Sequence, residues 1–127
     1  MVDASVLIAT IDVQDVHHEL AIAELEATRR QHALSLPAVA FSEALVLPYR
    51  MGPRPGRSIE GGLRRLGTVE PVTHEVASRA ARLRAERQIK LPDALILATA
   101  VELRADEILT FDRRWRSLDS RVRVLGL

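Results

Sequence analysis

The chain has 127 residues, of which 47% are apolar, and a formal net charge of +1. These values suit one compact domain over residues 1–127 with a single core, and the charge indicates no general affinity for polyanions. The absence of cysteine excludes disulfides, zinc–thiolate sites and thiol nucleophiles, and no apolar run is long enough to span a membrane. No basic secretory segment opens the chain, so we expect a cytoplasmic protein.

The first third predicts two strands and two helices. We expect a short strand at residues 1–3, an apolar helix at 5–11, and a strand at 33–36. Asp15 is expected to cap the helix between them, which ends near residue 32. Its predicted buried side chains are Val16, Leu20, Ala23 and Ala27.

The middle of the chain predicts helices joined by a surface loop. Pro37 is expected to occupy the first position of a helix that buries Val39, Val46 and Leu47. The Pro/Gly-rich residues 51–57 are typical of a loop. A short helix is then expected around Ile59, Leu63 and Leu66.

The last third alternates strands and helices. We expect strands at residues 69–72, 108–110 and 122–125, the first at a sheet edge because it contains Pro71. Thr73 is expected to cap a helix that buries Val76, Ala80 and Leu83, and residues 93–104 are expected to form a central buried helix. This alternation predicts an α/β fold with a mainly parallel sheet covered on both faces. In such sheets, ligands bind beyond the carboxyl ends of the strands.

Four acids are expected to lie near the carboxyl ends of the predicted strands. Asp3 and Asp112 each follow a predicted strand, Glu43 lies within an apolar helical stripe, and Asp93 lies in the first turn of the buried helix. Each also has a purely structural explanation. Asp3 and Asp112 could be helix caps, Asp93 could complement the helix dipole, and Glu43 could lie at the edge of its stripe.

Considered together, the four acids predict a cation site. Clustered carboxylates repel unless a counter-charge is present. Hard oxygen ligands without cysteine favour Mg²⁺ or Mn²⁺ over zinc. Such a site suits hydrolysis of phosphodiester bonds.

The motifs around these acids resemble those of the PIN domain family, and in length and layout the chain is most similar to VapC toxins of bacterial toxin–antitoxin pairs. The matching segments occur in the expected order and cover essentially the whole chain: residues 2–9, 42–45, 91–100 and 109–112. Two departures are Ala4, where many members have threonine, and a first strand shortened because only two residues precede Asp3.

The resemblance implies a three-layer α/β/α sandwich and Mg²⁺- or Mn²⁺-dependent endoribonuclease activity. It assigns metal binding to Asp3, Glu43, Asp93 and Asp112, and supporting roles to the hydroxyls of Ser5 and Thr110. It also implies an RNA substrate, a homodimer and a VapB-like antitoxin that blocks the site.

Two other functions remain open from the sequence. An aspartyl-phosphate phosphatase also uses strand-end acids but normally has a second acid two residues after the first, where this chain has Ser5. A catalytically silent regulatory module would keep the fold without needing all four acids.

The four histidines are not spaced like a metal-ligand set, and we expect surface or capping roles for the adjacent His17 and His18. Some arginines are candidates to contact an RNA backbone: Arg113, Arg114 and Arg116, and more weakly Arg50, Arg54 and Arg57.

Overall fold

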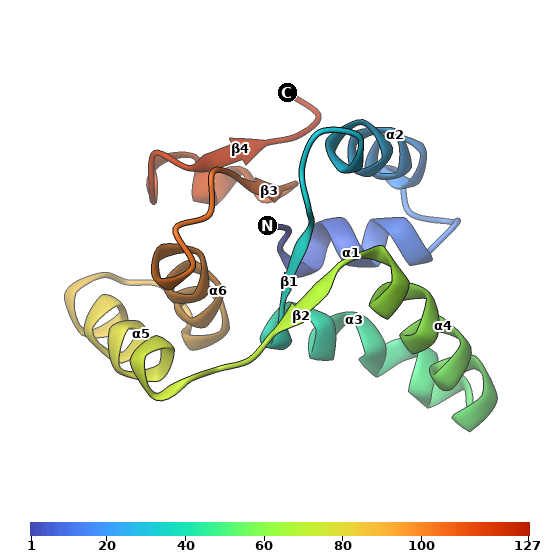
Figure 1. The fold of residues 1–127 in the computed structure, drawn as a ribbon, viewed down its shortest axis with the longest axis horizontal. Coiled ribbons are helices and arrows are strands. Elements are labelled where there is room, and N and C mark those ends of the chain that lie inside the picture. Colours follow the sequence, from blue (N-terminus) through green and yellow to red (C-terminus); the bar gives the residue numbers. More distant parts are fainter.

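A computed structural model describes all residues, 1–127. Helices surround a small set of parallel strands, and the chain ends near the strands β3 and β4 (Figure 1). No helix is long and apolar enough to cross a membrane. The helices are α1 (Ala4–Ile11), α2 (His18–Arg29), α3 (Ala38–Met51), α4 (Pro53–Leu66), α5 (His74–Glu86), α6 (Leu91–Glu102) and the 3₁₀ helix η1 (Arg113–Ser117). The strands are β1 (Ser35–Pro37), β2 (Thr68–Glu70), β3 (Ile108–Thr110) and β4 (Val122–Val124).

The strands form two parallel pairs that the N-terminal segment connects. Ser35 in β1 lies opposite Thr68 in β2, and Ile108 in β3 lies opposite Val122 in β4. Val2 forms a parallel bridge with Leu109 of β3, and its N–H donates to the Ser35 carbonyl at 3.2 Å. The predicted first strand is therefore a single bridge in the middle of the sheet, and the predicted α/β/α fold is confirmed.

Helix α6 is the central buried helix that its sequence predicts. Its buried side chains include Ile96, Leu97 and Thr99, although it begins at Leu91 and ends at Glu102, two residues earlier than expected at both ends. The main core joins residues from all parts of the chain, including Val2, Leu7, Leu36, Leu97, Ile108 and Trp115. Thr73 caps α5 as predicted, because its hydroxyl accepts from the Val76 N–H at 3.1 Å.

Two predicted helix faces are wrong. Helix α2 begins at His18, because the Asp15 carboxylate accepts from the His17 N–H in a preceding turn and caps no helix. Val16 therefore lies outside the helix and is 91% exposed. The shift rotates the inward face, which consists of Ala21 and Leu25 in place of Leu20, Ala23 and Ala27.

Helix α3 is rotated relative to the prediction as well. Pro37 precedes the helix as its cap, and the buried side chains are Ala40, Ala44, Leu45 and Pro48. Val46 and Leu47 are exposed. Small alanines allow this face to approach its neighbours closely, so it is buried in preference to the face with larger side chains.

The predicted loop at residues 51–57 is mostly helical. Helix α4 begins at Pro53, where proline is tolerated because N–H groups of a first helical turn have no partner within the helix. Gly52, with φ of 138°, makes the sharp turn from α3 that an L-residue would resist. Strand β2 ends at Glu70, before Pro71, and pairs only with β1, which confirms its position at an edge.

Candidate active site

The four predicted acids are electrostatic neighbours in the folded chain. The carboxylates of Asp93 and Asp3 both contribute to raising the pKa of Glu43, and the carboxylate of Asp112 contributes to raising the pKa of Asp93. The four groups are therefore linked in the order Asp3, Glu43, Asp93, Asp112. Asp3 follows the bridge at Val2, and Asp112 follows β3. Glu43 lies in the first half of α3, and Asp93 lies in the first turn of α6.

Asp3 is buried and held by three donors. Its Oδ1 accepts from the Ser5 hydroxyl at 2.6 Å and from the Val6 N–H at 3.3 Å, which caps α1. Its Oδ2 accepts from the Thr110 hydroxyl at 2.6 Å. Burial raises the pKa of Asp3, and these hydrogen bonds oppose the shift. The carboxylate is thus fixed in position and poorly solvated.

The same two hydroxyls connect Asp3 to the segment that carries Asp112. Ser5 Oγ accepts from the Phe111 N–H at 3.0 Å, and Thr110 Oγ1 accepts from the Asp112 N–H at 2.9 Å. Each hydroxyl therefore donates to Asp3 and accepts from the chain that follows β3. This network, which we call the Asp3 network, sets the position of the Asp112 backbone relative to Asp3.

Glu43 and Asp93 are only partly shielded from water. Burial is the largest cause that raises the pKa of each side chain, followed by neighbouring carboxylates. Glu43 is exposed on α3, outside the buried face of the helix, and Asp93 is half-buried in the first turn of α6. Neither carboxylate forms an ion pair with a basic side chain.

Asp112 has a different environment because an arginine covers its carboxylate. Arg114 donates from Nε to Oδ1 at 3.0 Å and from Nη2 to Oδ2 at 2.6 Å. The hydrogen bonds from Arg114 lower the pKa of Asp112. Asp112 also accepts from the Arg114 backbone N–H and so caps η1, the alternative that the sequence left open.

The donor set suits a hard divalent cation in charge and chemistry, although the side chains do not yet converge on one point. No group of three acidic or histidine side chains is positioned to hold an ion. The raised pKa values of Glu43 and Asp93 nonetheless show repulsion that a cation would relieve. To bind a cation, the Asp112 carboxylate would have to give up its hydrogen bonds with the Arg114 guanidinium.

The histidines lie outside this set of acids. The ring of His17 stacks on Phe111, with centroids 4.3 Å apart. His18 Nδ1 lies 2.7 Å from the Ala9 carbonyl oxygen. These two histidines therefore pack against, or hydrogen-bond to, neighbouring segments.

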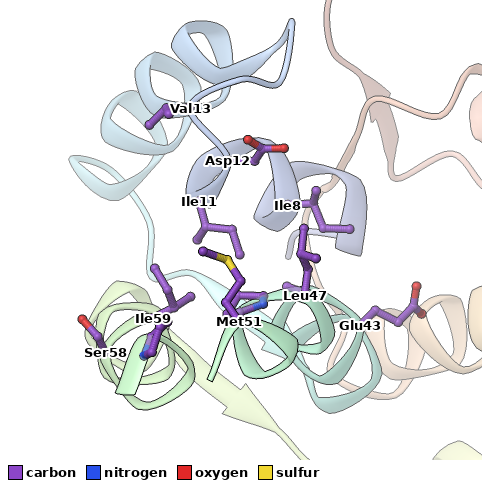
Figure 2. Close-up of a pocket in the computed structure, with 12 residues that line it drawn as sticks. Ile8, Ile11, Asp12, Val13, Glu43, Leu47, Met51, Ser58 and Ile59 are labelled. Atoms are coloured by element: carbon purple, nitrogen blue, oxygen red, sulfur yellow. The ribbon is translucent and has the colours of Figure 1, made fainter. Parts of the chain in front are cut away.

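An apolar groove that the sequence did not predict begins at Glu43. It has a volume of about 460 Å³ and lies between α1, α3 and α4, with Ile8, Leu47 and Met51 facing it and Ser58 at the far side (Figure 2). Leu47 is 60% exposed and Met51 71% exposed. Apolar residues of α3 occupy more than the one face that is buried against the core. This wide apolar surface is the sequence feature that could have predicted the groove.

Comparison with known proteins was made for both sequence and structure. The PIN domain family profile matches residues 1–120. No curated protein sequence is significantly similar to the chain.

Two solved structures share the fold. A toxin–antitoxin complex from Klebsiella pneumoniae contains a chain that is 26% identical, with a TM-score of 0.73, over 97% of this chain and 94% of that one. VapC20 of Mycobacterium tuberculosis, a toxin that cleaves the sarcin–ricin loop, is 21% identical, with a TM-score of 0.68, over 84% of this chain and 85% of that one.

Proposed function

Because the chain belongs to the PIN domain family, we propose that it is a divalent-metal-dependent endoribonuclease and the toxin of a VapBC-type pair. The observation that carries this proposal is the Asp3 network, which joins Asp3 to the segment of Asp112, with Glu43 and Asp93 as electrostatic neighbours of these two acids. The similarity to a chain of a toxin–antitoxin complex and to an RNA-cleaving toxin supports the same activity.

The acids would act together on one phosphodiester bond. Asp3, Glu43, Asp93 and Asp112 would hold Mg²⁺ or Mn²⁺, which supplies charge stabilisation at the phosphate and activates water. Ser5 and Thr110 would keep the Asp3 carboxylate at a fixed angle, since both hydroxyls already donate to it. Removing either hydroxyl would leave Asp3 with two of its three donors and a less firmly fixed carboxylate.

The test is cleavage of a labelled RNA in the presence of Mn²⁺, with native protein and Asp3→Asn. We expect activity to fall at least about 100-fold in the variant, because a fixed anionic oxygen ligand is lost. Circular dichroism checks the fold, and Asp12→Asn is the matched control because Asp12 is a half-exposed residue whose carboxylate accepts only from the Gln14 N–H. Equal cleavage by native protein and Asp3→Asn would refute this assignment.

The two open alternatives predict different results in the same assay. A phosphatase would release phosphate from a small phosphomonoester and leave RNA intact. A silent regulatory module would cleave neither substrate, with or without Mn²⁺. The presence of Ser5 where a phosphatase normally has its second acid favours the nuclease.

A VapB-like antitoxin is the partner that we propose for the apolar groove. A segment lying on Ile8, Leu47 and Met51 would end at Glu43 and so cover the acids. The similarity to a chain of a toxin–antitoxin complex supports this choice of partner. Leu47→Asp should reduce co-purification with a co-expressed antitoxin, and unchanged co-purification would count against the groove as its docking site.

We propose in addition that the toxin is a homodimer. Val46 and Tyr49 are exposed on α3, where they border an apolar hollow with Phe41 and Leu45. Burying this surface against a second copy would remove apolar area from water. Sedimentation at micromolar concentration should give twice the monomer mass, and Val46→Glu should shift it toward monomer.

A further inference from the structure

Helix α4 has a face made of arginines. Arg54, Arg57, Arg64 and Arg65 are all exposed. At 3.6 residues per turn they fall within an arc of about 100°. The buried residues Gly56 and Leu63 lie on the opposite side of the helix. We call these four arginines the α4 stripe.

The α4 stripe has no internal counter-charge. None of its guanidinium groups lies within 4.0 Å of a carboxylate. The one acid of α4, Glu60, lies beside the stripe, and its carboxylate accepts from the Tyr49 hydroxyl at 2.8 Å. Arg54 and Arg57 lie three residues apart on this face, so their charges repel each other, and no ion pair within the protein offsets them.

The arginines of α5 show the contrast. Each of the three donates to another group of the protein: Arg79 to Glu102, Arg82 to Ser78 and Arg84 to the Ile89 carbonyl. Arg87, which follows the helix, donates to the Leu118 carbonyl. The α5 arginines therefore form hydrogen bonds within the protein, whereas no arginine of the α4 stripe does so. Its four charges are available to a ligand.

Helix α4, which carries the α4 stripe, lies across the groove from Glu43, and none of the four arginines lines the groove itself. Ser58 and Ile59 of α4 line the side of the groove away from Glu43 (Figure 2). An acidic cluster repels a polyanion, and a net charge of +1 supplies little general attraction. A substrate cut at the acids therefore needs a basic surface elsewhere to hold it.

We propose that the α4 stripe binds the phosphate backbone of the RNA substrate, away from the bond that is cut. The inference rests on the proposed function for the identity of the polyanion. Arg54 and Arg65 are separated by about 16 Å along the helix axis, so the stripe contacts several phosphates. Guanidinium groups bind phosphate in a bidentate manner, and such contacts position a nucleic acid without selecting its sequence.

Binding of a fluorescein-labelled, 20-nucleotide single-stranded RNA to metal-free protein in EDTA tests the proposal, with fluorescence anisotropy measured at several salt concentrations. The variants are Arg64→Gln/Arg65→Gln and Arg54→Gln/Arg57→Gln. The control, Arg29→Gln/Arg30→Gln, removes an adjacent arginine pair at the end of α2, beside Glu26. Glutamine keeps the helix propensity of arginine, so all variants should fold.

We expect each stripe variant to weaken binding about fivefold or more at low salt. The slope of log K against log salt should become less steep by about 1.4, since each lost phosphate contact contributes about 0.7 for a single strand. The control should change the slope by less than half as much. Equal losses in all three variants would show that binding follows net charge alone and would overturn the proposal.

Two further results are decisive. If the stripe variants bind RNA normally but lose affinity for poly-glutamate, the stripe is a site for an acidic protein and the proposal is wrong. If native protein binds RNA through the stripe but does not cleave it with Mn²⁺, the nuclease proposal fails while the binding surface stands.

Discussion

The two ends of the acidic site are built differently. At the inner end, Asp3 is 5% exposed and is held by two hydroxyls and a backbone N–H. At the outer end, Asp112 is held by Arg114, whose side chain is 73% exposed. Asp3 is therefore fixed by buried neutral donors, whereas Asp112 is held by the guanidinium of an exposed arginine side chain.

This difference suggests a division of labour within the site. A buried hydrogen-bond network has one arrangement, because each unmade bond leaves a desolvated group without a partner. An exposed ion pair exchanges partners at little cost. The inner end can thus supply a preformed ligand, while the outer end releases its carboxylate when a divalent cation competes with Arg114.

The strongest test of the fixed inner end is Thr110→Val. Valine keeps the shape but leaves Asp3 Oδ2 and the Asp112 N–H without the Thr110 hydroxyl. We expect RNA cleavage to fall about 10- to 100-fold and the free energy of unfolding to fall by about 1–3 kcal/mol. Cleavage kinetics and urea denaturation measure the two effects.

Thr99→Val is the matched control for that variant. Thr99 is equally buried, but its hydroxyl donates only to the Leu95 carbonyl within α6, at 2.7 Å. It should lose some stability and retain cleavage activity. Similar losses of activity in the two variants would mean that the Asp3 network acts only through stability.

A smaller effect is expected from Arg114→Ala at the outer end. Removing the guanidinium frees the Asp112 carboxylate, so Mn²⁺ should bind about three- to fivefold more tightly, in line with the modest strength of an exposed ion pair. Calorimetry or Mn²⁺ paramagnetic resonance measures this affinity. Arg113→Ala is the control, because Arg113 makes no ion pair. Weaker Mn²⁺ binding by Arg114→Ala would contradict exchange at Asp112.

The smallest effect is expected from Asp93→Asn in metal-free protein. Its raised pKa means that ionised Asp93 is disfavoured in the folded state, so its contribution to stability is present at low pH and is lost as pH rises through the folded pKa. Asparagine should raise Tm by about 1–3 °C at pH 7, and this gain should vanish near pH 3.

Thermal denaturation in EDTA checks the sign of this effect. Asp119→Asn is the control, because Asp119 forms an ion pair with Arg121 at 3.0 Å and its loss should not raise Tm. Adding Mn²⁺ should stabilise the native protein more than Asp93→Asn. A lower Tm for metal-free Asp93→Asn would contradict the unfavourable ionisation of Asp93 that burial and the neighbouring Asp112 carboxylate cause.

Asp3 and Asp112 lie at strand ends, as the sequence predicted, whereas the buried faces of α2 and α3 differ from the predicted ones. Asp3 and Asp112 are tied to short strands, whose position follows from apolar runs and the parallel topology. The faces of α2 and α3 depend on where each helix starts and on which neighbour approaches it, and periodicity alone does not determine these. The groove at Leu47 was missed for the same reason. Of the α4 stripe, the sequence indicated Arg54 and Arg57 as candidates for RNA contact but not Arg64 and Arg65.

The edge strand β2 has a consequence for assembly. It offers only three residues, and Pro71, immediately after it, lacks the N–H that an added strand would need. Pairing of an exposed edge strand with the backbone of another chain leads to aggregation. Short edge strands that end at a proline resist this pairing. The β2 edge therefore offers a second copy of the protein little backbone to pair with.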